Sequence, residues 1–186
     1  MIAPISMAEG DYGIVTAVDT LRIERLLPGP IERIWAYVTE PDKRRQWMAA
    51  GAIELFDGGA VEHIADNSKL TAKWDRPPPK YARHAGKTRS RGRVTACDPP
   101  FVIAYTWNEE TETPSEVRFE LAPEGDRVRL TLTHSRIASR DTMLSFAAGW
   151  HTHLDILRDA LEGRAYEVFW PKHTRLEAEY GRRIPA

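Results

Sequence analysis

Apolar residues between Ser139 and Gly163 recur with the spacing of a helix. With one residue every 100°, seven of them fall within an arc of roughly 100°, the width of a core-facing stripe. They are Met143, Phe146, Ala147, Trp150, Leu154, Leu157 and Leu161. Ser139 is suited to cap the start of this helix, and Gly163 to follow its end. The pattern predicts a long amphipathic helix, which needs a sheet to cover its apolar stripe.

Most of the chain before this helix has strand-like patterns, in which apolar and polar residues alternate. In the clearest example, Val117, Phe119 and Leu121 alternate with charged residues. The predicted strands are 12–16, 20–27, 53–56, 61–65, 70–74, 89–97, 101–107, 116–121 and 128–134. The last four read as consecutive antiparallel neighbours.

Two short helices are predicted after the second strand. Pro30 suits the first helical position before 31–39, because its missing N–H would have no partner there. A second helix, 42–48, follows, with Arg44 and Arg45 expected to face water. Helices that cover one face of an antiparallel sheet define an α+β architecture.

The length fits a single domain. We expect it to span residues 1–186, with a core of about 12–163 and a C-terminal tail, 164–186, that carries a short helix. A dimer through Phe169 and Trp170 of this tail is one possibility, and folding of the tail onto its own domain is the other.

Composition and charge restrict the partners. The net charge is −1 and the sequence pI about 6.6, which gives no global attraction to nucleic acid or anionic membranes. The single cysteine, Cys97, excludes an internal disulfide and a cysteine zinc cluster. No apolar run reaches the ~18 residues that span a bilayer, and no signal segment is recognisable. We therefore expect a cytoplasmic protein with no nucleic-acid partner.

Five segments carry a resemblance to a known superfamily. They are residues 25–35 (RLLPGPIERIW), 98–107 (DPPFVIAYTW), 115–121 (SEVRFEL), 130–134 (LTLTH) and 149–155 (GWHTHLD). The chain resembles the START-like, or SRPBCC, superfamily, and within it bacterial proteins similar to the C-terminal domain of the chaperone ATPase activator Aha. This resemblance implies a helix-grip (Bet v 1-like) fold, with a curved antiparallel sheet of about six to seven strands around the C-terminal helix and a cavity between them.

The superfamily includes lipid carriers, hormone receptors and polyketide cyclases, so the fold alone does not choose a function. A cavity of this fold would bind an apolar or aromatic small molecule. The expected lining residues are Trp35, Trp47, Phe56, Tyr105, Trp107, Phe119, Leu132, His134, Phe146, Trp150 and His153. The alternative is a filled core, in which these rings contact each other.

An enzyme of the cyclase or dehydratase type would use the same cavity. His134 and His153 are the candidate acids or bases, because the unperturbed pKa of histidine lies near neutrality. His63 and Tyr105 are further candidates for polar contacts. The sequence contains no nucleophile motif and no phosphate-binding loop.

No metal or cofactor is expected. His151 and His153 lie about 200° apart around a helix axis, so they cannot hold one metal ion together. A basic segment, 76–93, contains five Arg and two Lys and no acid. It is either an anion site or a solvated face. A third functional class, stimulation of a chaperone ATPase, follows from the resemblance to Aha.

Overall fold

The structure, a computed structural model, describes residues 9–71 and 75–185. In this part of the chain, seven strands form one antiparallel sheet in the order β1-β2-β7-β6-β5-β4-β3. The strands are β1 (Ile14–Ala17), β2 (Thr20–Pro28), β3 (Ala60–Ala65), β4 (Thr88–Asp98), β5 (Val102–Trp107), β6 (Ser115–Glu124) and β7 (Arg127–Ser135). The helices are α1 (Ile31–Thr39), α2 (Pro41–Arg44), α3 (Arg140–Glu162) and α4 (Phe169–Arg183), with 3-10 turns η1 (Glu9–Asp11), η2 (Asn67–Lys69) and η3 (Pro79–His84).

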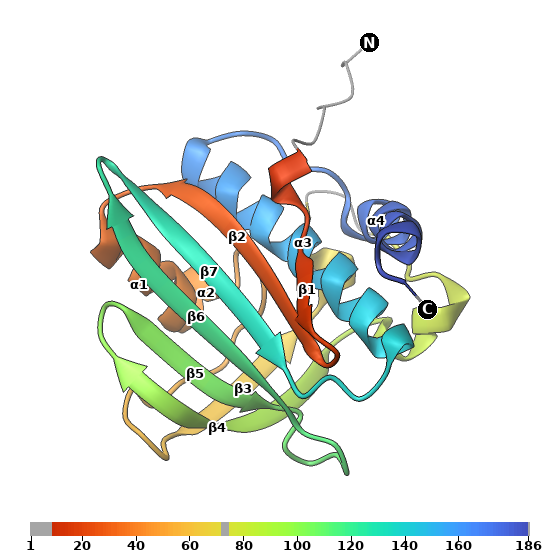
Figure 1. The fold of residues 1–186 in the computed structure, drawn as a ribbon, viewed down its shortest axis with the longest axis horizontal. Coiled ribbons are helices and arrows are strands. Elements are labelled where there is room, and N and C mark those ends of the chain that lie inside the picture. Colours follow the sequence, from red (N-terminus) through yellow and green to blue (C-terminus); the bar gives the residue numbers. More distant parts are fainter. Residues whose placement is uncertain (1–8, 72–74, 186) are drawn as a thin grey trace.

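The sheet curves around α3, the long helix that the sequence predicts (Figure 1). Ser139 caps its start by accepting a hydrogen bond from the Thr142 N–H at 3.2 Å, and Gly163 ends it with φ 68°. The apolar stripe packs against the sheet, and Leu154 and Leu157 are fully buried. These features confirm the α+β class and the helix-grip fold.

The segment before β3 does not form the predicted strand 53–56. Only the isolated bridges Ala50 to Ile64 and Ile53 to Val61 join it to β3. The chain turns back on itself here, since the Phe56 N–H donates to the Glu54 carbonyl and leaves no extended ladder. Residues 72–74 of the predicted strand 70–74 lie outside the described residues.

The C-terminal tail is a larger element than expected. Its helix α4 has 15 residues and packs along α3, on the side away from the sheet (Figure 1). Phe169 and Trp170 are buried, at 0% and 3% exposure. They pack inside their own chain and are not free to form a dimer contact.

A buried carboxylate joins these layers. Asp155 of α3 lies 3.0 Å from the guanidinium of Arg25 in β2 and 2.6 Å from the Lys172 ammonium in α4. Arg158, one turn along α3, pairs with the same carboxylate at 3.1 Å. Burial alone raises the pKa of Asp155, but its contact with His151 and the charges of Arg25 and Lys172 outweigh burial and lower it. The ionised carboxylate therefore links the sheet, α3 and α4.

Arg44 differs from its expected position at the surface. It is completely buried, whereas Arg45 is exposed as predicted. The Arg44 guanidinium donates hydrogen bonds to the carbonyl oxygens of Thr39 and Gly51. These backbone acceptors hold the segment after α1 against the start of the following loop.

Strands β4 and β5 approach each other closely at Gly92. Their register shifts between Val94 and Ala96, and a Cβ added at Gly92 would overlap the carbonyl oxygen of Thr106. Only glycine allows this close backbone approach.

We expect Gly92→Ala to lower the free energy of unfolding by about 1–3 kcal/mol, because the added methyl group forces the two strands apart. Urea denaturation measures the change. Gly181→Ala is the matched control, since its Cβ meets no atom within 4 Å and a helical glycine gains stability on this change. Equal stability of the two variants would contradict the explanation.

Replacing Asp155 by Asn should destabilise the fold by about 3–5 kcal/mol, because Arg25 would remain buried without its carboxylate and Lys172 would keep only Glu167, at 3.6 Å. Glu120→Gln breaks the exposed pair with Arg118 and should cost less than about 1 kcal/mol. Urea denaturation at pH 7 compares the two. A small loss at Asp155 would show that the buried network does not hold the layers together.

Candidate functional site

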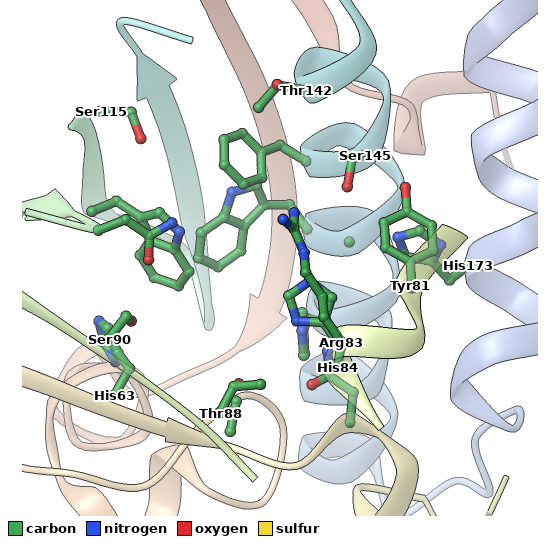
Figure 2. A pocket seen from close by; sticks show the side chains of 18 of the residues that line it. His63, Tyr81, Arg83, His84, Thr88, Ser90, Ser115, Thr142, Ser145 and His173 are labelled. Atoms are coloured by element: carbon green, nitrogen blue, oxygen red, sulfur yellow. The ribbon is translucent and has the colours of Figure 1, made fainter. Parts of the chain in front are cut away.

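A cavity of about 770 Å³ opens between α3 and the end of the sheet that carries β3 and β4. Figure 2 shows its wall of strands, with His63 from β3 and Ser90 from β4. The opposite wall comes from η3, including Arg83, and from the α3 and α4 helices, including Ser145 and His173.

Aromatic rings form the apolar part of the wall. Trp107 of β5 and Trp150 of α3 meet edge to face with ring centroids 5.3 Å apart. Phe146 of α3 and Phe169 of α4 also line the cavity. The surface they make suits a flat apolar molecule.

Four of the residues expected to bind a ligand line this cavity: Trp107, Phe146, Trp150 and His153. Five others lie in the closed core: Trp47, Tyr105, Phe119, Leu132 and His134. The residues predicted to bind a ligand are thus divided between the cavity wall and the filled core. In the core, Phe119 contacts both Trp47 and Tyr105, with ring centroids 6.3 and 6.4 Å away.

Two expected residues lie elsewhere. Trp35 of α1 is half-buried and packs on the core from the helix side. Phe56 is 58% exposed and does not face inward as expected, because its segment turns away from β3 instead of joining the sheet. Neither lines the cavity.

His134 is buried behind Phe146, with the two rings stacked at a centroid distance of 4.2 Å. The Trp150 indole N–H donates to its Nδ1 at 2.9 Å, so Nδ1 carries a lone pair. In the neutral ring the proton is then on Nε2, which donates to Ser115 Oγ at 2.7 Å. Burial lowers the pKa of His134 to about 3. His134 is therefore neutral, with no free lone pair for a general base.

This arrangement also decides the role of Ser115. A histidine that activates a serine must accept the hydroxyl proton. Here the Nε2 of His134 donates, so Ser115 is not an activated nucleophile. Its own hydroxyl proton is free to point toward an acceptor in the cavity that Ser115 lines.

His153 has a different environment. Its Nδ1 lies 2.7 Å from the carbonyl oxygen of Trp47, which can only accept, so the proton is on Nδ1 and Nε2 keeps a lone pair. Burial lowers the pKa of His153 to about 4. Of the two predicted histidines, only His153 lines the cavity with an acceptor nitrogen.

His63 adds a polar group that the sequence ranked below these two. It is 3% exposed and lines the cavity, and within residues 9–71 and 75–185 neither ring nitrogen has a hydrogen-bond partner. The hydroxyl of Tyr105, whose ring centroid is 5.2 Å away, is likewise without a partner. Burial, assisted by the charge of Arg44, lowers the pKa of His63 to about 3.

Sequence reasoning missed the wall formed by η3 and α4. Tyr81, Arg83 and His84 come from the former, and Trp170 and His173 from the latter. The spacing of Phe169, Trp170 and His173 was a helical signal, but only the fold shows that this helix reaches the cavity.

No three His, Cys, Asp or Glu side chains within residues 9–71 and 75–185 come together in a way that could hold a metal ion. None of the helices described is both long and apolar enough to cross a membrane.

The sequence model of the Activator of Hsp90 ATPase homolog 1-like protein family matches residues 28–162. The chain belongs to this family. The match ends with α3, so the cavity residues of α4 lie beyond the matched segment.

Solved structures extend the comparison over most of the chain. A protein of Bordetella parapertussis, solved by NMR in solution, is 40% identical, with 94% of this chain and 91% of that one covered and a TM-score of 0.78. CalU16 from Micromonospora echinospora is 20% identical, with coverages of 90% and 89% and a TM-score of 0.65.

DynU16, from the dynemicin biosynthetic locus, is 17% identical, with 78% of this chain and 48% of that one covered and a TM-score of 0.61. At such identities these two structures show the fold alone. The family match and these neighbours place the chain in the START-like superfamily. No curated protein matches the sequence.

The buried histidines of this family member make its stability depend on pH. An unfolded chain binds their protons below pH 6.5, whereas folded His63 and His134 bind them only near pH 3, and His153 near pH 4. Above pH 6.5 these histidines are neutral in both states and do not change the free energy of unfolding. Below pH 6.5 the free energy of unfolding decreases until the pH reaches these lower values.

His63→Phe tests this dependence, because the ring keeps its shape and no hydrogen bond is lost. Each buried histidine lowers the free energy of unfolding by about 1.4 kcal/mol for every pH unit below 6.5. The variant should therefore lose about 2–3 kcal/mol less stability than the wild type between pH 7.5 and 4.5, measured by urea denaturation. An identical pH profile would show that His63 becomes protonated in the folded state.

Proposed function

We propose that this protein binds an apolar or aromatic small molecule in the cavity between α3 and the sheet. The observation that carries the proposal is the cavity of about 770 Å³ with Trp107, Phe146 and Trp150 in its wall. Ligand sites typically have volumes of about 300–1,000 Å³ and combine an apolar lining with a few polar groups.

The polar groups in the cavity suggest what the ligand must offer. The Ser115 hydroxyl is a donor for a ligand carbonyl, because its oxygen already accepts from His134. The Nε2 of His153 is an acceptor for a ligand hydroxyl. Unpartnered His63 supplies one donor and one acceptor as a neutral ring. An aromatic compound with hydroxyl and carbonyl substituents satisfies all three.

Membership of the START-like superfamily supports ligand binding, and it is also compatible with catalysis. Of the two predicted histidines, His153 would be the base of a cyclase or dehydratase reaction, since both nitrogens of His134 are engaged. Stimulation of a chaperone ATPase is the third candidate, and its support is the family description alone.

The neutral fluorescent probe N-phenyl-1-naphthylamine tests the cavity directly. We expect it to bind the wild type with enhanced emission and with quenching of tryptophan fluorescence. Gly149→Leu should weaken this binding at least about tenfold, because Gly149 lines the cavity and an added Cβ there meets no atom within 4 Å. The leucine side chain would occupy the ligand's space and stabilise the helix.

Gly181→Leu is the matched control. Gly181 is also a helical glycine with free space around its Cβ, but it does not line the cavity. It should leave probe binding unchanged. Probe binding that is absent from the wild type, or equal in the two leucine variants, would refute the proposed function.

A further inference from the structure

Positively charged side chains outnumber negatively charged ones around the cavity. Its lining contains four cationic side chains, Lys80, Arg83, Arg89 and Arg136, and one carboxylate, Asp141. This excess is local, because the whole chain has a net charge of −1. A cavity lined by one sign of charge attracts ligands of the opposite sign.

Three of the four cations already have carboxylate partners. Lys80 pairs with Asp141 and Glu177 at 2.9 and 2.8 Å. Arg89 pairs with Glu62 at 3.1 Å. Arg136 and Glu116 pair more loosely, at 3.6 Å. These pairs reduce the attraction of the three cations for a ligand.

Arg83 is the exception. No carboxylate in the part of the chain that the structure describes lies within 4.0 Å of the Arg83 guanidinium, and its Nε donates a hydrogen bond to Nε2 of His84 at 3.1 Å. The two terminal nitrogens of the guanidinium remain available. Figure 2 shows Arg83 on the η3 side of the cavity, across from His63 and Ser90.

The polar groups of the cavity differ in how deeply they are buried, and this difference would orient a bound ligand. Arg83 is exposed, whereas His63, Ser115 and His153 are 3%, 5% and 9% exposed. A guanidinium at the mouth can bind a carboxylate or sulfonate through two parallel hydrogen bonds while that group stays partly solvated. The apolar body of the ligand then lies between the aromatic side chains further in.

We propose that the ligand of this cavity is an aromatic anion, whose carboxylate or other planar anionic group binds the Arg83 guanidinium at the mouth. This inference rests on the proposed function and narrows its ligand class. It also gives a role to one residue of the basic segment 76–93, whose remaining cations are paired or do not line the cavity.

Two probes of similar shape separate the anion site from the cavity itself. 8-Anilino-1-naphthalenesulfonate carries a sulfonate, and N-phenyl-1-naphthylamine is its neutral analogue. We expect Arg83→Gln to weaken binding of the anionic probe about tenfold, the loss expected for one charge-assisted interaction, and to change the neutral probe less than twofold. Arg83→Lys should recover part of the loss.

Arg91→Gln is the matched control. Arg91 belongs to the same basic segment, is exposed and, within the described residues, has no carboxylate within ion-pair distance of its side chain. It does not line the main cavity. Its variant has the same net charge as Arg83→Gln and should bind both probes like the wild type. Gly149→Leu should block both probes, which locates them in the cavity.

The outcomes separate the two proposals. If both probes bind and the Arg83 and Arg91 variants behave alike, the cavity binds aromatic molecules but Arg83 is not an anion site. If neither probe binds the wild type, the proposed function fails and the anion site fails with it. Selective loss of the anionic probe in Arg83→Gln alone supports the inference.

Discussion

The fold depends on burying α3 on two sides at once, and the Asp155 carboxylate is the interaction that makes this possible. A helix with an apolar stripe on one side normally leaves its other side in water. Here the second side is covered by α4, so a carboxylate at its centre loses its hydration. Arg25 from the sheet and Lys172 from α4 replace that hydration with opposite charge. The two layers are thereby held to the same helix.

The cavity follows from how these layers meet. Near Leu154 and Leu157, α3 packs directly on the sheet and no space remains. The first half of α3 lines the cavity opposite β3 and β4, and η3 and α4 close the remaining side. The cavity is thus the unfilled end of the core. Aromatic side chains, among them the contacting pair Trp107 and Trp150, line this end.

The histidines around this space differ in chemical role although burial lowers the pKa of each. His134 has both nitrogens engaged by neighbours and serves to orient Trp150 and Ser115. His153 has one nitrogen fixed by a backbone carbonyl and the other free. Neither nitrogen of His63 has a hydrogen-bond partner among the residues that the structure describes. All three are buried histidines, so their chemical roles differ only because their hydrogen bonds differ.

Periodicity in the sequence by itself determined the long helix, the α+β class and the element order except for the predicted strand 53–56, because burial of one face imposes a regular spacing on each element. It also indicated Trp107, Phe146, Trp150 and His153. Only the tertiary structure decided which inward residues fill the core and which line the cavity, since both kinds occupy the same phase of the pattern.

The charged residues show the same limit. Arg25 follows the buried alternation of Leu21 and Ile23, and Arg44 reads as a surface residue, yet both are buried. Their partners, the Asp155 carboxylate and the Thr39 carbonyl, cannot be read from local spacing. Whether a charge faces water or a partner depends on which distant segments the fold brings together. These pairs form only when the sheet and the helices pack together, whereas the periodicity of the sequence indicates only the face of its element on which each residue lies.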